Sequence, residues 1–446
     1  MTRVITYGTY DLLHQGHINL LRRAKALGDY LIVGVTSDSF DKGRGKLNVR
    51  NNVLERVEAV KATGYADEVI IEDYLGQKID DIQRYNVDIF AIGSDWEGKF
   101  DYLNEYCKVV YLPRTEGISS TQLREESQDI YRIGIVGSGR IARRFVPEAG
   151  MVNGAQVSAV FNPDSHEAAA FAQQFGLQPC DRYETMLDNV EAVYIASPHL
   201  THYAYAKQAL QAGKHVLCEI PLVLSGDEAR ELYELAEAKN LVLLEANKTA
   251  YCPAFNHIVT LVKSGIVGDV VDVRASLSKM VNAPTRELDA TQAGGAVNEH
   301  ASITLMAIIK ILGRDFSQVA FFSKKEGGVD VYSKVIVNFP HATSSITLGV
   351  GVKTEGDLVI SGTKGYVYVP APWWLTDFFE VRYEDQTKNK KYFYSYDGEG
   401  LRYEIQEFIS MIVNGRRSCY KLRRRECIAI ADIIGQYNQG INITWI

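Results

Sequence analysis

The chain has 446 residues, 46% of them hydrophobic, which is too long for one hydrophobic core and sufficient for two or three domains. Its formal net charge is −7, so we expect no basic surface for nucleic acid. No apolar run approaches the roughly 20 residues that span a bilayer, and Met1-Thr2-Arg3 leads directly into a predicted strand, so we expect no membrane insertion and a cytoplasmic location.

The first predicted strand, Arg3 to Tyr7, leads into a turn and then into a helix with apolar residues at helical spacing from Ile18 to Leu27. The turn runs Gly8-Thr9-Tyr10-Asp11-Leu12-Leu13-His14-Gln15-Gly16-His17. The start of a helix presents free N–H groups and the positive end of its dipole, which together favour an anion. We therefore predict a phosphate site in which His14 and His17 act together and in which Gly8 and Gly16 let the backbone approach the phosphate.

Three further features follow in the same part of the chain. Arg56 lies on a predicted helix from Asn51 to Thr63, and Ser94-Asp95-Trp96 follows a predicted strand from Asp88 to Gly93. The run Arg114-Thr115-Glu116-Gly117-Ile118-Ser119-Ser120-Thr121 combines an arginine with hydroxyl groups before a helix. With the histidine-containing turn, these features resemble the HxGH nucleotidylyltransferases, specifically their glycerol-3-phosphate cytidylyltransferase branch, over about the first 127 residues.

The resemblance implies transfer of CMP from CTP to a small alcohol phosphate, with Mg²⁺ accompanying CTP and no metal site of the protein itself. A phosphate monoester is already ionised at pH 7, so its attack needs position and charge stabilisation rather than a general base. The predicted catalytic residues are His14, His17, Lys46 and Arg114. The predicted substrate-binding residues are Gly8, Thr9, Tyr10, Asp11, Arg56, Asp95, Trp96, Ser119, Ser120 and Thr121.

Two assignments in this region stay open, and the acceptor is inferred from the resemblance. The loop from Asp41 to Lys46 carries Lys42, Arg44 and Lys46, and either closes over the phosphates or forms a solvated basic turn. For Asp11 we favour a helix-capping role over direct contact with substrate. The resemblance implies glycerol 3-phosphate as acceptor and CDP-glycerol, for a cell-surface polymer, as product. Related members use choline or ethanolamine phosphate, whose cationic groups favour aromatic cages. Trp96 is the only tryptophan of this region, and the resemblance places it near the cytidine, so we favour an uncharged polyol.

A second nucleotide-binding pattern begins after the polar stretch from Glu125 to Asp129. The run from Ile133 to Ala142 predicts a strand, a GxGxxA turn and a helix, which is the pattern that admits a dinucleotide pyrophosphate. Further strands are predicted at Gln156 to Phe161, Ala192 to Ala196, His215 to Cys218 and Val242 to Glu245, with helices between them. This alternation predicts a doubly wound parallel sheet of the α/β class.

From about Tyr131 onward the chain resembles the Gfo/Idh/MocA oxidoreductases, most clearly at Tyr194 to His202 and at Ala212 to Leu222. After Lys263 to Gly268 the pattern changes to alternating strands, which we place at Val331 to Phe339, Ser344 to Val350, Asp357 to Val369 and Phe378 to Tyr383. In the family this half is an open antiparallel sheet that binds substrate and often forms dimers, so a homo-oligomer is expected. The predicted domains are 1–129, a cytidylyltransferase Rossmann-like fold; 130–250, a Rossmann dinucleotide-binding fold; and 251–446, an α+β sheet domain.

The resemblance implies NAD or NADP in the second domain. The predicted cofactor-binding residues are Gly137, Gly139, Arg140, Ile141, Asn162, Ser197, Pro198, His202 and Glu219. Asn162 stands where the family pattern places the carboxylate that binds the adenosine ribose, so that charge is missing.

The residues expected to perform hydride chemistry depart from the family pattern. Ile220 occupies the lysine position of the family's Glu-Lys-Pro motif, and its aspartate and histidine pair falls on Glu299 and Ile303. Losing such groups costs roughly 10² to 10⁴ in rate each, so we predict that the second domain lacks the usual redox catalysis. Lys248 and Tyr251 are either a displaced proton donor or a lysine at a helix start with a packed tyrosine.

Three functional hypotheses follow from these observations. In the first, the chain is a cytidylyltransferase whose second part binds a nucleotide or forms a dimer without redox turnover. In the second, a bifunctional enzyme reduces a keto-sugar or keto-triose phosphate with NAD(P)H and then activates the alcohol with CTP. In the third, nicotinamide occupancy regulates the transferase.

Overall fold

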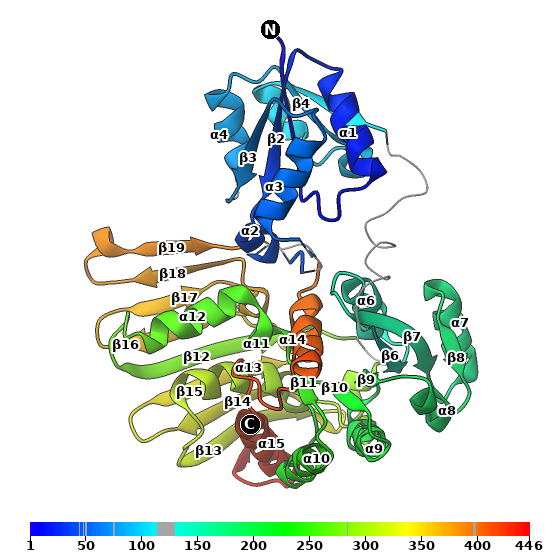
Figure 1. Ribbon diagram of the computed structural model, residues 1–446. Coiled ribbons are helices and arrows are strands. Elements are labelled where there is room, and N and C mark those ends of the chain that lie inside the picture. Colours follow the sequence, from blue (N-terminus) through cyan, green and yellow to red (C-terminus); the bar gives the residue numbers. More distant parts are fainter. Residues whose placement is uncertain are drawn as a thin grey trace. The chain divides into compact units, whose positions relative to one another are not determined.

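The computed structural model describes residues 1–43, 45–47, 49, 51–74, 76–113, 130–282, 284–395 and 398–446. The chain divides into two compact units (Figure 1). The first unit is built from Met1–Ile130, and the second from Tyr131 onward apart from two short segments, Met151–Gly154 and Ser395–Asp397. Each unit is described by itself.

The first unit is a parallel sheet in the order β3-β2-β1-β4-β5. The strands are β1 (Arg3–Gly8), β2 (Tyr30–Thr36), β3 (Glu68–Glu72), β4 (Ile89–Gly93) and β5 (Lys108–Leu112). The helices are α1 (Gln15–Lys25), α2 (Asp38–Gly43), α3 (Val53–Ala62) and α4 (Gln77–Arg84), with 3₁₀ turns η1 (Ser94–Trp96) and η2 (Asp101–Glu105). The strand order reverses between β1 and β4, and ligands of such sheets bind at the carboxyl ends of the strands at this point.

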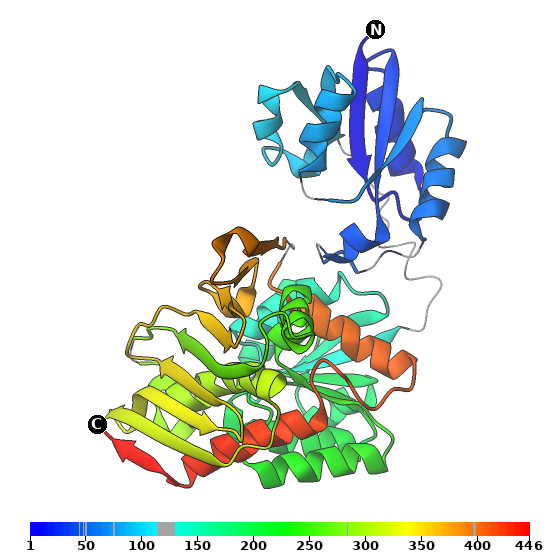
Figure 2. The same ribbon diagram turned by 90° about the vertical axis from the view of Figure 1, so that its left-hand side faces the viewer.

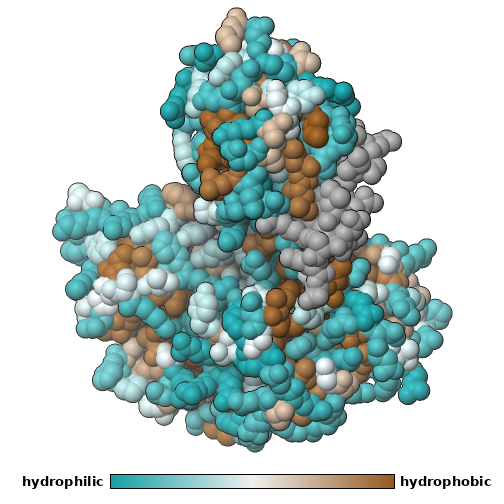
Figure 3. Space-filling model, in the orientation of Figure 1, coloured by the Kyte–Doolittle hydropathy of each residue, from teal (hydrophilic) through white to brown (hydrophobic). Residues whose placement is uncertain are grey.

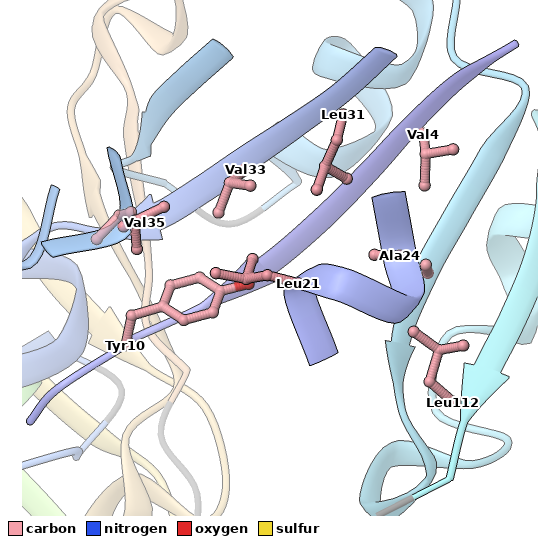
Figure 4. Packing of buried hydrophobic residues seen from close by; sticks show 10 residues of the cluster. Val4, Tyr10, Leu21, Ala24, Leu31, Val33, Val35 and Leu112 are labelled. Carbon is pink, nitrogen blue, oxygen red and sulfur yellow. The ribbon is translucent and has the colours of Figure 1, made fainter. Parts of the chain in front are cut away.

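Successive residues of a strand face opposite sides of the sheet. Both faces of this sheet are buried, because helices pack on each of them. On one face Val4 and Leu31 pack with Leu21 and Ala24 of α1, as Figure 4 shows. On the other face the core residues include Ile5, Ile32, Phe90, Ile82 of α4 and Leu103 of η2. The strands predicted at Arg3 to Tyr7 and at Asp88 to Gly93 therefore belong to a sheet that is covered on both sides.

The second unit begins with a parallel sheet in the order β11-β10-β9-β6-β7-β8. Its strands are β6 (Tyr131–Val136), β7 (Ala155–Phe161), β8 (Gln178–Cys180), β9 (Ala192–Ile195), β10 (His215–Glu219) and β11 (Leu243–Ala246). The connecting helices are α6 (Arg140–Ala149), α7 (Ser165–Phe175), α8 (Tyr183–Asp188), α9 (His199–Gln211) and α10 (Gly226–Ala238). This is the predicted doubly wound sheet, with its reversal of strand order between β6 and β9.

The rest of the second unit is a larger sheet in the order β19-β18-β17-β16-β12-β15-β14-β13-β20. Its strands are β12 (Val270–Ser278), β13 (Gln318–Glu326), β14 (Val329–Asn338), β15 (Thr343–Gly349), β16 (Leu358–Gly362), β17 (Tyr366–Val369), β18 (Phe378–Arg382), β19 (Lys390–Phe393) and β20 (Ile443–Trp445). The helices are α11 (Lys248–Tyr251), α12 (Pro253–Lys263), α13 (Ala296–Leu312), α14 (Leu401–Val413) and α15 (Arg424–Asn438). The largely buried α13 packs against β12, β14, β15 and α15.

The larger sheet differs in two respects from the antiparallel sheet expected from sequence. Two neighbouring pairs, β12 with β15 and β13 with β20, are parallel, so the sheet is mixed although mostly antiparallel. The predicted strand from Asp357 to Val369 is two antiparallel strands, β16 and β17. The C-terminal segment, red in Figure 2, runs from α15 into the edge strand β20. Only the folded chain reveals β20, because its pairing partner Phe321 to Ser323 lies about 120 residues away in sequence.

Hydrophobic residues on the face drawn in Figure 3 form separate patches among hydrophilic ones. Within the described ranges, no helix has the length and hydrophobicity needed to cross a membrane. All six cysteines are free thiols, five of them buried and Cys107 partly exposed.

Candidate functional site

The turn between β1 and α1 has a strained backbone. Tyr10 and Leu12 have φ angles of 52° and 47°, a left-handed conformation that non-glycine residues rarely adopt. Such residues cost about 1 to 3 kcal/mol each and persist where the surroundings hold them. The Tyr10 side chain is 2% exposed and packs toward Leu21, as Figure 4 shows. The core of the first unit thus fixes the shape of this turn.

The two histidines of the turn lie against each other at the start of α1. Their rings stack with centroids 3.9 Å apart and planes inclined by 21°. His14 is the N-cap of α1, and its Nδ1 accepts a hydrogen bond from the Gly16 N–H at 3.1 Å. A neutral imidazole whose Nδ1 accepts carries its proton on Nε2, so His14 presents an Nε2–H donor. The edge of Tyr10 packs on His17 with ring centroids 5.5 Å apart.

Lys46 is brought to the end of β1 by a polar cluster. Its Nζ donates to Thr9 Oγ1 at 2.6 Å. The buried Asp41 carboxylate accepts from the Thr36 hydroxyl at 2.6 Å and from the Thr9 hydroxyl at 3.3 Å. The sequence interpretation of Asp41 to Lys46 as a loop is wrong in its first half, because Asp41 to Gly43 form the end of α2. Lys42 is exposed on α2, whereas Lys46 is partly buried, and closure of this segment over phosphates stays a prediction.

Arg56 is a buried centre of hydrogen bonding rather than an open substrate contact. Its side chain is fully buried, and its guanidinium donates to backbone oxygens of Thr9, Thr36 and Asn51 at 2.8 to 2.9 Å. It also pairs with Asp38 at 2.6 Å and Asp41 at 3.3 Å. These bonds connect the ends of β1 and β2 to α2, and contact between Arg56 and substrate stays a prediction.

Asp11 is the N-cap of neither α1 nor α3, contrary to the helix-capping role that we favoured. Its carboxylate accepts from the backbone N–H of Asn51 at 3.0 Å, whereas α1 is capped by His14 and α3 by Asn52. At the end of β4, Asp95 is exposed and Trp96 is half-buried in η1. The Lys99 ammonium lies 5.0 Å from the centroid of the Trp96 ring. Since β1 and β4 are neighbours in the sheet, Trp96 follows the strand next to the one that leads to the histidines.

A separate pocket of about 980 Å³ lies within the second unit, where the carboxyl ends of its parallel strands meet. Gly137 has a φ angle of +97°, and a Cβ there would lie 2.6 Å from the carbonyl oxygen of Ala196, so only glycine fits. The pocket is lined by every predicted cofactor-binding residue: Gly137, Gly139, Arg140, Ile141, Asn162, Ser197, Pro198, His202 and Glu219.

Two of the residues that line this pocket, His202 and Asn162, contact neighbouring polar groups of the protein. The ring nitrogens of the buried His202 lie 2.8 Å from the Ser197 carbonyl oxygen and 2.9 Å from that of Pro221, so the ring joins the loops after β9 and β10. Burial lowers the pKa of His202. The Asn162 amide donates to Ser138 Oγ at 2.8 Å, and its oxygen accepts from the Asp164 N–H at 2.9 Å.

The positions expected for the aspartate and the histidine, Glu299 and Ile303, lie on α13 and line the same pocket. Glu299 accepts a bidentate pair of hydrogen bonds from Arg286 at 2.7 and 2.9 Å, and Ile303 contributes only hydrocarbon. His300 is largely buried, and burial lowers its pKa to about 4, so it is neutral at pH 7. Of the two proposed substitute donors, Lys248 lines the pocket, whereas Tyr251 is 1% exposed and its hydroxyl donates to the Glu245 carbonyl oxygen at 2.8 Å.

Residues 5–126 match the family model described as cytidylyltransferase-like. Glycerol-3-phosphate cytidylyltransferases from Bacillus spizizenii and Bacillus subtilis are 51% and 52% identical over 131 and 126 residues, covering 97% of each of those proteins and 28% of this chain. The chain belongs to the cytidylyltransferase-like family.

The second unit of this chain consists of oxidoreductase-family domains that are fused to the cytidylyltransferase-like part. Residues 131–247 match the model of the oxidoreductase family with an NAD-binding Rossmann fold, and residues 255–368 match the GFO/IDH/MocA C-terminal domain. Trans-1,2-dihydrobenzene-1,2-diol dehydrogenase from Oryctolagus cuniculus is 29% identical over 325 residues, 98% of that protein and 70% of this chain. KijD10, a 3-ketoreductase from Actinomadura kijaniata solved with NADP and TDP-benzene, has the same fold, with a TM-score of 0.64 and 21% identity over 71% of this chain and 99% of that one.

We call the first unit the cytidylyltransferase domain and the second the oxidoreductase domain. Four predicted residues of the cytidylyltransferase domain, Arg114, Ser119, Ser120 and Thr121, lie outside the described residues, as does Arg44. The remaining predicted residues lie at or near the carboxyl ends of β1, β2 and β4.

Sequence reasoning missed several charged residues of the oxidoreductase pocket, among them Arg286 and Lys279, and also the fully buried Glu404. Arg286 holds Glu299, and Lys279 lines the pocket from just beyond the end of β12. Glu404 lies on α14 and is 0% exposed. No local motif marks these positions, because packing of the larger sheet and its helices brings Arg286 and Lys279 to the pocket and buries Glu404.

Proposed function

We propose that the chain transfers CMP from CTP to glycerol 3-phosphate, forming CDP-glycerol and pyrophosphate. The observation that carries this proposal is the stacked pair His14 and His17 at the N-terminus of α1, with Lys46 bonded to Thr9 nearby. The domain containing them is 51% identical to a glycerol-3-phosphate cytidylyltransferase over nearly the whole of that protein.

In the proposed reaction, a phosphate oxygen of glycerol 3-phosphate attacks the α-phosphorus of CTP. The new phosphorus–oxygen bond forms as the bond to pyrophosphate breaks, and no proton has to be removed from the nucleophile. The Nε2–H of His14, the His17 ring and the Lys46 ammonium would stabilise the charge that builds on the phosphates. Mg²⁺ would enter with the triphosphate, its usual partner in such reactions.

An uncharged acceptor agrees with the surroundings of Trp96. The Lys99 ammonium already lies over this ring, 5.0 Å from its centroid. A choline or ethanolamine group would meet a second cation at the same aromatic surface, which disfavours cation–π recognition there. Glycerol 3-phosphate, whose head group is neutral, avoids this repulsion.

The test is release of pyrophosphate from CTP and Mg²⁺ with glycerol 3-phosphate, choline phosphate and ethanolamine phosphate as acceptors. We expect glycerol 3-phosphate to have the highest kcat/KM. We also expect His17→Ala to lower kcat by about 10²-fold or more, because transition-state charge loses a partner. His166→Ala, which changes an exposed histidine of α7, is the control. Choline phosphate as the best acceptor would contradict the specificity, and a small effect of His17→Ala would contradict the catalytic role.

We further propose that the oxidoreductase domain binds NADP in the pocket beside Gly137. Asn162 provides a neutral amide where a carboxylate would bind the 2′-hydroxyl of NAD and repel a 2′-phosphate. Arg140, which also lines the pocket, supplies positive charge. Titration of the whole chain with NADPH and NADH, followed by calorimetry, tests this assignment. Tighter binding of NADPH is expected, and preference for NADH would contradict it.

A further inference from the structure

The oxidoreductase domain contains a second pocket, with a volume of about 850 Å³. Its lining comes mainly from α10, the last residues of α12, α13 and α14, the segment between α14 and α15, and the start of α15. Helix α15 packs against α10 and α13, which are labelled near it in Figure 1. The volume lies within the roughly 300 to 1,000 Å³ of pockets that hold small molecules.

This second pocket is separate from the one beside Gly137. Among the described residues, the two pockets have no lining residue in common. Helix α13 contributes to both, since Ile303 lines the pocket beside Gly137 and Lys310 lines the second pocket. At a rise of 1.5 Å per residue these two positions are about 10 Å apart along the helix axis. A ligand of the second pocket is therefore not part of a dinucleotide held at the glycine turn.

The lining of the second pocket has an excess of positive charge, so we call it the cationic pocket. Seven of the residues that line it are lysine or arginine, and three are aspartate or glutamate. The first turn of α15, Arg424 to Glu426, belongs to the lining, so the positive end of the helix dipole adds to this charge. The whole chain has a net charge of −7, so the pocket differs in sign from the chain. A concave surface lined by one sign of charge concentrates ions of the opposite sign.

Two of these cations are compensated by carboxylates. Lys310, which is 6% exposed, pairs with Glu426 at 3.1 Å, and Arg424 pairs with Glu237 at 2.5 Å. The Lys310 ammonium also donates to the carbonyl oxygen of Tyr420 at 2.5 Å, so it connects α13 to the segment before α15. These paired groups hold the wall of the pocket in place.

Other cations of the pocket have no such compensation. Within the described residues, the side chains of Arg314 and Arg425 form neither a hydrogen bond nor an ion pair, and Arg423 forms no ion pair. The third acid of the lining, Asp315, also forms no ion pair in this part of the chain. The uncompensated cations thus outnumber the uncompensated acid, and their N–H groups are available to an anion.

The surroundings of Lys263 show that the cations of this pocket repel one another. Partial burial and the charges of Lys310 and Arg423 lower the pKa of Lys263, while Glu426 raises it. The Lys263 ammonium has no hydrogen bond or ion pair with any described residue. A bound anion removes this repulsion, and the relief favours binding.

The cationic pocket also offers apolar contact, including one exposed aromatic ring. Tyr420 is 64% exposed, whereas Leu243, Ile309 and Met411 of the lining are largely buried. Guanidinium groups bind phosphate oxygens through paired N–H donors, and an aromatic ring stacks on a nucleobase. Phosphate groups therefore match the cations, and a base attached to them would match the tyrosine.

We propose that the cationic pocket binds a small polyphosphate, either as inorganic pyrophosphate or as the phosphate chain of a nucleotide. Arg314, Arg423 and Arg425 donate to the phosphate oxygens, and Lys263 adds a fourth cation. In a nucleotide the base packs on the Tyr420 ring. The site uses none of the residues that carry the proposed CMP transfer or the proposed NADP binding, so it depends on neither.

Hydrogen exchange of the whole chain, read by mass spectrometry, tests this site in the peptides that cover Arg417 to Glu426. The probes are pyrophosphate and CTP, without Mg²⁺ or an acceptor so that no transfer occurs, and sulfate at the same ionic strength is the control anion. We expect slower exchange in these peptides with pyrophosphate, with CTP or with both. An effect of pyrophosphate supports recognition of the phosphates alone, and an effect of CTP alone supports a nucleotide. No effect of either probe, or an equal effect of sulfate, which would show an adventitious ion only, overturns the proposal.

A double variant tests the cations directly. Arg314→Met combined with Arg425→Met removes two uncompensated charges and breaks no bond with the described residues. The probe concentration that gives half-maximal protection should rise by about 10-fold or more, because hydrogen bonds to charged groups are lost. Arg182→Met is the matched control, since Arg182 is exposed and does not line the pocket. Thermal unfolding reports whether each variant is folded, and unchanged protection in a folded double variant overturns the proposal.

Tyr420→Ala separates the two forms of the ligand. It removes the ring but keeps the carbonyl oxygen that accepts from Lys310. If a nucleotide binds, CTP affinity should fall by about 10-fold while pyrophosphate affinity stays the same; unchanged affinities for both would support recognition of the phosphates alone. Because protection is read at this pocket, its outcome is distinguishable from failure of CMP transfer or of NADP binding elsewhere in the chain.

Discussion

Replacing Arg56 by methionine should lower the stability of the cytidylyltransferase domain more than it changes substrate binding. The Arg56 side chain is 0% exposed and bonds to three backbone oxygens and two carboxylates. Asp41, one of those carboxylates, is 1% exposed. Methionine fills much of the same volume but leaves Asp41 without its guanidinium, so the variant isolates the loss of charge and hydrogen bonds.

The magnitude follows from the burial of each partner. Breaking a buried ion pair on one side costs about 3 to 5 kcal/mol, because a charge is left without compensation. The Asp38 bond adds little, since Asp38 is 40% exposed and such pairs contribute about 0 to 1 kcal/mol. For a domain of about 130 residues, 3 to 5 kcal/mol corresponds to a fall in Tm of roughly 10 to 20 °C.

Calorimetry of the whole chain resolves this change as a shift of the cytidylyltransferase transition alone. Arg84→Met, which alters an exposed arginine at the end of α4, is the matched control and should leave that transition in place. Steady-state kinetics below the lowered Tm complete the comparison. An unchanged Tm together with a raised KM for the acceptor would refute the structural role and show that Arg56 acts through substrate contact.

Two further predictions concern the oxidoreductase domain. Burial raises the pKa of Asp330 to about 6. Because the folded value exceeds the unfolded one, the stabilising contribution of this carboxyl is fully present below about pH 4 and is lost as pH rises through 6. The unfolding free energy of the parent should therefore drop by about 3 kcal/mol relative to Asp330→Asn between pH 4 and 7. Urea titrations measure this difference, and parallel pH profiles would contradict it. Arg402→Met should cost about 3 to 5 kcal/mol, because it leaves the buried Glu148, which Arg402 holds at 2.5 Å, without its cation. Arg132→Met removes a solvent-exposed pair and should change stability little. Equal losses for the two variants in denaturant unfolding would count against this reasoning.

The sequence by itself determined the two nucleotide-binding folds and the residues at their first turns. Alternating apolar strands and helices specify parallel sheets through local periodicity. The turns after β1 and β6 are continuous segments, so their functional residues are adjacent in the sequence. His14, His17 and the glycines from Gly137 onward were therefore predictable, as were β1 and β4 of the first parallel sheet and every strand of the second except β8. The same local reasoning misplaced Asp11, whose partner Asn51 is 40 residues away.

Only the tertiary structure decided which distant residues share a site. One pocket is lined by Ile220, which follows β10, by Lys248 at the start of α11 and by Leu401 of α14, although no sequence spacing connects them. The burial of Arg56 and the parallel pairs of the larger sheet were likewise decided by long-range contacts. The physical reason is that periodicity and turn chemistry act between near neighbours along the chain, whereas burial, ion pairing and strand register depend on segments that meet only in the folded protein.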